Sequence, residues 1–155
     1  MPHTFALIPA SYVYLLRGDE VLLQRRAATG YMDGHWVAGA AGHVEPGETA
    51  RAAAVRETAE ELGVRIRPQD LELLTVMQRT DGAGEPVEQR VDWFWAVRRW
   101  EGEPRLCEPA KASGLDWFVR DTLPAPMPAY ERRVVRGIDE AGLPAATSFG
   151  FGADD

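Results

Sequence analysis

The stretch from Thr49 to Leu62 constrains the fold most, because it is the one long segment with a clear helical character. It is rich in Ala, Glu and Arg and contains no Gly or Pro, a composition that favours an α-helix. Thr49 or Glu48 can accept hydrogen bonds from the first backbone amides, and Gly63 stands where a helix ends. The sequence therefore predicts a helix over residues 49–62.

Short runs of β-forming residues lie on both sides of this helix. Tyr12–Leu16 and Val21–Leu23, separated by a Gly-Asp turn, predict a hairpin. Further strands are predicted at Trp36–Val37, Leu71–Gln78, Val87–Val97 and Trp117–Val119. A second helix is predicted over residues 130–141. We therefore expect an α/β fold with helices packed on a sheet, in one domain over residues 1–144, followed by a loose tail at 145–155.

The predicted helix has an apolar edge and an acidic edge. At about 100° per residue, one arc of roughly 80° collects the apolar side chains Ala52, Val55, Ala59 and Leu62. Nearly opposite lie the carboxylates of Glu57, Glu60 and Glu61. Such an edge is often a solvated surface, here with an Arg56–Glu60 pair at i,i+4 spacing. Carboxylates this close also repel one another unless cations compensate, and Mg²⁺ prefers hard oxygen ligands.

The spacing of the residues around this helix favours a metal site over a solvated surface. From residue 42 to residue 64 the chain reads GHVEPGETARAAAVRETAEELGV. This segment resembles the Nudix box, whose fixed positions are matched by Gly42, Glu48, Arg56, Glu57, Glu60, Glu61, Gly63 and Val64. Thr58 departs from the pattern, because the family prefers a bulky aliphatic residue there, and we expect this to affect packing more than chemistry. Leu23–Ala28 and Phe94–Pro104 are similar to strands of MutT-type nucleoside triphosphate pyrophosphohydrolases.

The resemblance implies a fold, a metal and a reaction. The family fold is an α/β/α sandwich around a mixed β-sheet, and the family reaction is attack of water on phosphorus in a nucleoside diphosphate derivative. By matched position, Glu57, Glu60 and Glu61 bind Mg²⁺, for which Mn²⁺ can substitute. One of them, or a nearby loop acid, accepts the proton of the attacking water. The backbone carbonyl of Ala41 and the carboxylate of Glu108 are further metal ligands by the same resemblance.

The remaining matched residues are expected to shape the site. Arg56 is expected to act with the catalytic glutamates by fixing the loop or one carboxylate. The box residues with a structural role are Gly42, Glu48 and Gly63. Arg26, and with less support Arg25, can bind a substrate phosphate through guanidinium hydrogen bonds; the alternative is that both are surface arginines.

The substrate is predicted by elimination. The signatures of ADP-ribose, diadenosine polyphosphate, NADH and coenzyme A hydrolases are missing, which leaves hydrolysis of a nucleoside triphosphate to a monophosphate and pyrophosphate. Another nucleoside diphosphate-linked compound, such as a nucleotide sugar or a dinucleotide, stays open. The asparagine with which MutT-type enzymes read the base is missing from Pro126–Tyr130, so no base preference follows. A Nudix-fold isomerase and a non-catalytic binding module are weaker alternatives, because Cys107 is the only cysteine and every box glutamate is present.

The composition limits the classes of partner that the protein is expected to bind. The net charge of −7 argues against a nucleic-acid surface, which needs clustered Lys and Arg. No apolar run approaches the roughly 18 residues of a membrane span. The single cysteine excludes an internal disulfide and favours a cytoplasmic location. We therefore expect a small-molecule nucleotide as the partner, with no nucleic acid and no membrane, whereas the choice between monomer and homodimer is open.

Overall fold

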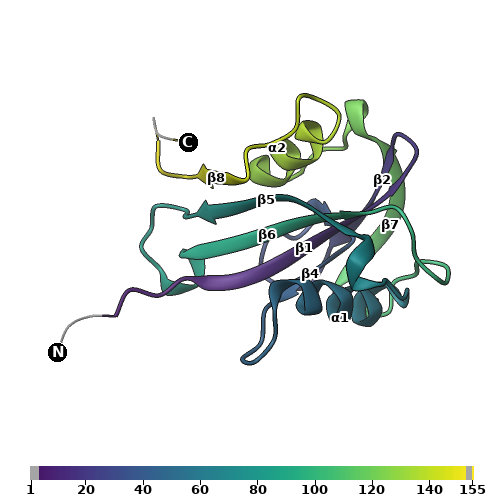
Figure 1. Cartoon of the computed structure of the whole chain (residues 1–155), viewed down its shortest axis with the longest axis horizontal. Helices are drawn as coiled ribbons and strands as arrows, with labels where there is room; N and C mark the ends of the chain where they lie inside the picture. The colour runs from purple at the N-terminus through teal and green to yellow at the C-terminus, as the bar shows by residue number, and fades with distance from the viewer. Residues whose placement is uncertain (1–3, 153–154) are drawn as a thin grey trace.

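The computed structural model describes residues 4–152 and 155, and its centre is a mixed β-sheet (Figure 1). The strands run in the order β3-β2-β1-β6-β5-β8, while β4 pairs with β1 and β7 pairs with β2. β1 runs parallel to β6, and β5 runs parallel to β8, whereas the other pairs are antiparallel. The strands are β1 (Ile8–Arg17), β2 (Glu20–Arg26), β3 (Trp36–Ala38), β4 (Ala40–His43), β5 (Leu71–Arg79), β6 (Arg90–Val97), β7 (Ala112–Val119) and β8 (Ala146–Phe149).

Two helices cover opposite faces of this sheet, which confirms the expected α/β/α arrangement. Figure 1 shows α1 (Ala50–Leu62) and α2 (Ala129–Gly137) on the two sides. Strand β1 supplies both hydrophobic cores, because alternate side chains of a strand point to opposite faces. Tyr12, Tyr14 and Leu16 pack with α2, whereas Val13 and Leu15 pack with α1. Short 3-10 turns lie at Pro68–Asp70, Pro86–Glu88 and Arg120–Thr122.

Helix α1 begins and ends where the sequence predicts. The Thr49 side chain accepts a hydrogen bond from the Ala52 amide, as an N-cap does. Gly63 ends the helix with φ 68°, in the left-handed region, and its amide donates to the Ala59 carbonyl. Glycine adopts this conformation without the steric cost of a Cβ, so the residue fits the position.

The buried face of α1 differs from the prediction. The buried residues are Ala53, Ala54, Thr58 and Leu62, whereas Ala52 and Ala59 are exposed. At about 100° per residue, the buried arc contains Glu57 and Glu61, so these carboxylates turn toward the protein and not toward solvent. The apolar pattern was misleading because part of the inward face consists of carboxylates.

Thr58 lies in this buried face and not beside it. Its side chain is completely buried, and its hydroxyl donates to the Ala54 carbonyl at 2.7 Å. The hydrogen bond satisfies the polar group inside the core, as a buried hydroxyl requires. A polar residue is therefore accommodated where an aliphatic one is usual.

The hairpin of β1 and β2 is confirmed, while several other boundaries move. β6 begins at Arg90, because the preceding residues form a 3-10 turn, and α2 ends at Gly137, before the predicted residue 141. The prediction of a loose tail was wrong for Ala146–Phe149, which form β8 and pair in parallel with β5. None of the helices in the described part of the chain is long and apolar enough to cross a membrane.

Candidate active site

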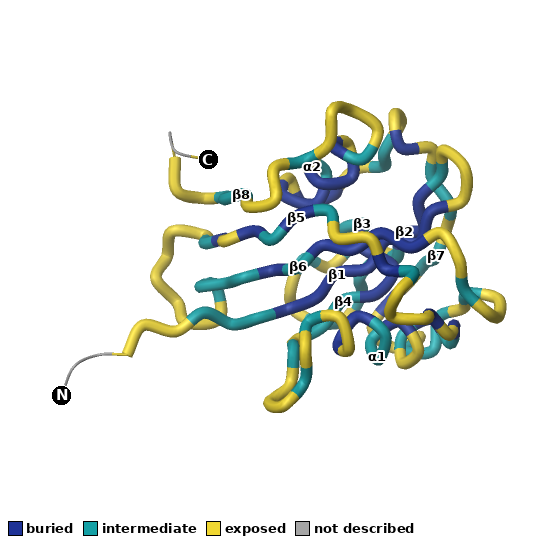
Figure 2. Tube along the Cα trace, in the orientation of Figure 1, coloured by how far each residue is buried: buried dark blue, intermediate teal, exposed yellow. Residues whose placement is uncertain are grey.

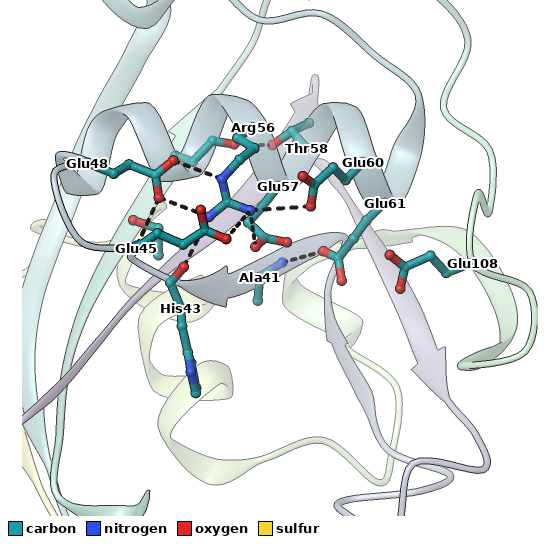
Figure 3. Close-up of polar contacts among 12 residues, drawn as sticks. Ala41, His43, Glu45, Glu48, Arg56, Glu57, Thr58, Glu60, Glu61 and Glu108 are labelled. Atoms are coloured by element: carbon teal, nitrogen blue, oxygen red, sulfur yellow. Dashed lines mark hydrogen bonds and ion pairs between the residues drawn. The ribbon is translucent and has the colours of Figure 1, made fainter.

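Arg56 ties the loop before α1 to the helix itself (Figure 3). Its Nε and Nη2 donate to the two carboxylate oxygens of Glu48 at 2.8 and 2.9 Å, and Nη2 also donates to the His43 carbonyl at 3.1 Å. On the helix, Nη1 donates to Glu57 at 2.8 Å and to Glu60 at 3.3 Å. The hydrogen bonds from Arg56 lower the pKa of Glu48 to about 2. Glu48 therefore holds the Arg56 guanidinium in position, and Arg56 directly contacts Glu57 and Glu60.

Glu57 and Glu61 turn from α1 toward strand β4. Glu61 accepts a hydrogen bond from the Ala41 amide at 2.6 Å. The Glu57 carboxylate lies against Gly42, so a Cβ at this position would force the Glu57 side chain to move away. Burial raises the pKa of Glu57, although Arg56 opposes the shift. Burial also raises the pKa of Glu61 to about 8, and the negative charges of Glu57 and Glu108 add to the rise.

Glu108 joins these two carboxylates from a loop that is distant in the sequence. Figure 3 shows its side chain beside that of Glu61. Its negative charge raises the pKa values of both Glu57 and Glu61, and its own carboxylate lies 3.2 Å from the Lys111 ammonium. Glu60 is different, since its side chain is 51% exposed while that of Glu57 is 13% exposed. The structure therefore gathers Glu57, Glu61 and Glu108 and leaves Glu60 at the rim.

A cavity of about 220 Å³ lies beside this acidic group. It is bordered by Glu61 of α1, Arg26 of β2, Tyr12 of β1, and Tyr130 and Glu131 of α2, so it reaches from Glu61 to the α2 side of the sheet. A smaller cavity of about 40 Å³ shares Glu61 and Arg26 with it and is also lined by Glu108. Acidic and basic side chains therefore line both cavities.

The two candidate phosphate-binding arginines have different positions. Arg26 lines both cavities, and its guanidinium donates to the Tyr31 carbonyl at 2.8 Å and the Thr29 hydroxyl at 3.1 Å. Arg25 lines neither, and its Nε donates to the Gly34 carbonyl at 3.3 Å. The alternation of side chains along β2 explains this difference. Only Arg26 is placed to meet a ligand of the cavity.

Comparisons with known proteins identify the family of the chain. The NUDIX domain family model matches residues 6–138. The chain belongs to the Nudix family. It is 38% identical over 86 residues to an 8-oxo-dGTP diphosphatase of Escherichia coli (strain K12), covering 56% of this chain and 61% of that protein. It is 33% identical over 131 residues to the NAD-capped RNA hydrolase NudC of Stutzerimonas stutzeri (strain A1501), covering 83% of this chain and 42% of that protein.

A solved structure agrees with this assignment. The crystal structure of a MutT NUDIX hydrolase from Burkholderia pseudomallei superposes with a TM-score of 0.75 at 28% identity. The match covers 85% of this chain and 98% of that one. The chain spans less than two thirds of the length of the two curated relatives named above. The resemblance to MutT-like Nudix proteins is therefore shown for fold and family.

The acidic residues of the Nudix box fit a divalent cation by their chemistry. Nudix hydrolases generally use divalent metal ions. Among residues 4–152 and 155, no three His, Cys, Asp or Glu side chains are placed so that together they could hold a metal ion. Glu57, Glu61 and Glu108 nevertheless lie close enough for their charges to interact, and burial raises the pKa values of Glu57 and Glu61. Carboxylate oxygens are hard ligands of the kind that Mg²⁺ prefers.

Sequence reasoning missed Glu131, the most deeply buried acid of the cavity. It is fully buried, and its Oε1 accepts hydrogen bonds from the Tyr14 hydroxyl and the Ala38 amide, both at 2.8 Å. A signal was present, because Glu131 precedes the buried Val134 and Val135 by three and four residues and so shares their helix face. Burial raises the pKa of Glu131 to about 7.

Proposed function

We propose that this chain is a metal-dependent pyrophosphohydrolase that converts a nucleoside triphosphate into a monophosphate and pyrophosphate. The observation that carries the proposal is the convergence of Glu57, Glu61 and Glu108 beside a cavity that also presents Arg26. Phosphoryl chemistry of this kind needs positioning and charge neutralisation more than covalent catalysis. Carboxylates that bind a metal ion would supply charge neutralisation, and an arginine that binds phosphate would position the substrate.

Glu57, Glu61 and Glu108 would hold Mg²⁺, or Mn²⁺ in its place, with the Ala41 carbonyl as a further ligand. Bound there, the metal would neutralise phosphate charge and lower the pKa of a coordinated water. Glu60 would contribute less, because its side chain points to solvent and contacts Arg56. The same three carboxylates are close enough to this space to accept the proton of the attacking water.

Arg56 and Arg26 have separate tasks in this proposal. Arg56 holds Glu57 at 2.8 Å and so fixes the carboxylate against Gly42. Arg26 offers a guanidinium at the border of both cavities, where it can bind a phosphate oxygen. Arg25 has no part in this proposal, because it lines neither cavity.

The size of the main cavity favours one nucleoside over two. Its volume of about 220 Å³ is below the roughly 300–1,000 Å³ of pockets that enclose drug-sized ligands. One base with its sugar suits this space better than a dinucleotide or a nucleotide sugar. The match to an 8-oxo-dGTP diphosphatase also supports a nucleoside triphosphate, whereas the match to an NAD-capped RNA hydrolase keeps dinucleotide compounds as the alternative.

An isomerase and a binding module have less support. Cys107 follows the end of α1, where its amide donates to the Glu61 carbonyl, and it lines neither of the two cavities. A catalytic cysteine would have to face the substrate. The intact and partly buried box glutamates would serve no purpose in a module that only binds.

Phosphorus NMR of the products tests this proposal. The protein is incubated with deoxynucleoside triphosphates and Mg²⁺, and we expect pyrophosphate and a nucleoside monophosphate. ADP-ribose and a nucleotide sugar run in parallel under the same conditions as competing substrates. Release of orthophosphate with a nucleoside diphosphate, or turnover of the competing substrates alone, would contradict the proposal.

A further inference from the structure

Arg26 uses only part of its guanidinium to contact the loop that follows β2. Its Nε donates to the Tyr31 carbonyl at 2.8 Å, and its Nη2 donates to the Thr29 hydroxyl at 3.1 Å. Its Nη1 has no hydrogen-bond partner among the described residues. A guanidinium presents its N–H groups in a rigid planar fork, so the two contacts with the loop also fix the direction of Nη1. The N–H groups of Nη1 are therefore available to a ligand.

Asp33 organises the same loop, although it lines neither of the two cavities. Its Oδ1 accepts from the Thr29 hydroxyl at 2.6 Å and from the Thr29 amide at 3.0 Å. Its Oδ2 accepts from the Gly30 amide at 2.9 Å. These hydrogen bonds, that of the Thr29 hydroxyl first, lower the pKa of Asp33, so the group is a carboxylate at neutral pH. Hydrogen bonds to an ionised acceptor are stronger than those between neutral groups.

The Thr29 hydroxyl connects the Asp33 carboxylate to the Arg26 guanidinium. A hydroxyl has a single proton to donate and two lone pairs. The proton can go to Asp33 at 2.6 Å or to the Tyr31 carbonyl at 2.9 Å, and the shorter, charge-assisted bond favours Asp33. The lone pairs then accept from Arg26 Nη2 and from the Tyr31 amide at 3.2 Å. Without the carboxylate, the hydroxyl would turn to the Tyr31 carbonyl, which Arg26 Nε already uses.

The loop has a backbone conformation that needs such support. Ala28 and Met32 have φ values of 55° and 53°, in the left-handed region that is costly for a residue with a Cβ. Conformations of this kind persist where surrounding contacts hold them. Tyr31 and Met32 line the 220 Å³ cavity together with Arg26, so the supported loop forms part of the cavity wall.

We propose that Asp33 is a positioning residue, which holds the Arg26 guanidinium toward the substrate phosphate through the Thr29 hydroxyl. The inference rests on the proposed nucleotide hydrolysis, in which Arg26 binds a phosphate oxygen, and it adds the residues that orient this arginine. The positive charge of Arg26 already acts on Glu61, whose pKa it lowers, so the guanidinium is oriented within range of the acidic group. Without Asp33, Arg26 would have to be ordered when the ligand binds, which weakens binding.

The kinetic test measures KM and kcat for deoxynucleoside triphosphates with Asp33→Ala and Thr29→Val. Each variant should raise KM by about fivefold, the size of one hydrogen bond, and change kcat little, because a contact made equally with substrate and transition state affects KM alone. Thr29→Ser keeps the hydroxyl and should recover most of the loss. Asp81→Asn is the matched control, since Asp81 is an exposed loop aspartate that accepts from the Ala83 amide and lines neither cavity. Its KM should equal that of the wild type.

A double-mutant cycle with Arg26→Ala decides whether Asp33 acts through Arg26. Once Arg26 is removed, Asp33→Ala should raise KM no further, because the two changes affect one contact. An unchanged KM in Asp33→Ala, or an equal rise with and without Arg26, would overturn the proposal.

Calorimetric titration with inorganic pyrophosphate and Mg²⁺ repeats this cycle without turnover. We expect Asp33→Ala to weaken binding by about fivefold when Arg26 is present and not at all when it is absent. Failure of the proposed hydrolysis is distinguishable, because the wild type would then cleave no triphosphate. The titration would in that case decide on Asp33 alone, and absent binding or an unchanged affinity would count against its role.

Discussion

Glu61, which is partly buried, and Glu131, which is fully buried, line one cavity, and the contrast between them explains the site. Each accepts a backbone amide from a strand of the sheet, Ala41 for the first and Ala38 for the second. Burial raises the pKa of Glu61 to about 8 and that of Glu131 to about 7. Figure 2 shows that much of the buried chain lies in the central strands β1, β2 and β6.

The neighbours of the two acids are opposite in character. Glu61 lies with Glu57 and Glu108, whose charges raise its pKa further. Glu131 is hydrogen-bonded to the Tyr14 hydroxyl and is influenced by Arg79, both of which lower its pKa. The two carboxylates therefore differ in what surrounds them. Glu61 lies among like charges and is suited to a cation, whereas Glu131 already accepts two hydrogen bonds on Oε1.

The largest expected effect is the loss of metal. Excess EDTA should abolish turnover, because Glu57, Glu61 and Glu108 then repel both one another and the phosphates. Addition of Mg²⁺ or Mn²⁺ beyond the chelator should restore it. A coupled pyrophosphate assay follows both steps, and full turnover in EDTA would refute the metal-dependent reaction.

Next in size is the effect of neutralising one inward glutamate. Glu57→Gln and Glu61→Gln should each lower kcat by roughly 10²–10³-fold, the size seen when one electrostatic contact to the reacting group is removed. Glu60→Gln serves as the matched comparison on the same helix and should lose much less, since that side chain is 51% exposed. Equal losses in all three variants would remove the distinction between inward and rim carboxylates.

The same variants should behave differently in stability. Without metal and above pH 8, where the Glu61 carboxylate is ionised, Glu61→Gln removes a desolvated charge from beside Glu57 and Glu108, so its melting temperature should rise above that of the wild type. Glu60→Gln should leave it nearly unchanged, because an exposed ion pair contributes little. Thermal unfolding in EDTA measures both, and a fall for Glu61→Gln would show that its carboxylate is stabilising.

The sequence predicts the place of Glu61 in this site better than that of Glu131. The limits of α1 were predictable because Thr49 and Gly63 act through local backbone hydrogen bonds. The Nudix box identified Glu57 and Glu61, although the apolar pattern placed them on the wrong face. Glu131 carries no motif, and its burial depends on Tyr14 and Ala38, which are 117 and 93 residues away. The pairing of β8 with β5 is equally non-local, so a short polar segment looked like a tail.

A smaller effect concerns pH and the stability contributed by Glu131. Its pKa rises from 4.5 to about 7 on folding, so the folded state binds the proton more tightly. The free energy of unfolding should therefore fall as pH increases from about 4.5 to about 7, by about 3 kcal/mol from this group. Glu131→Gln should flatten this dependence in urea titrations at pH 5 and 7.5 in EDTA. An unchanged slope would mean that Glu131 titrates normally.

The smallest expected effect belongs to Glu108. Its side chain is 40% exposed and paired with Lys111, so Glu108→Gln should slow the reaction by only about tenfold. High Mg²⁺ should recover most of the loss, because a loop carboxylate adds to a site that the helix already forms. A Mg²⁺ titration of kcat decides this, and a variant with unchanged rate and metal dependence would make Glu108 a surface acid.

Binding of Mn²⁺ to Glu61→Gln and Glu131→Gln tests the contrast between the two acids most directly. Electron paramagnetic resonance counts free Mn²⁺ in solutions of the wild type and each variant. We predict that Glu61→Gln loses most of the binding and that Glu131→Gln retains wild-type affinity. Equal retention by both variants, or a loss confined to Glu131→Gln, would contradict the assignment of the metal to the α1 side of the sheet.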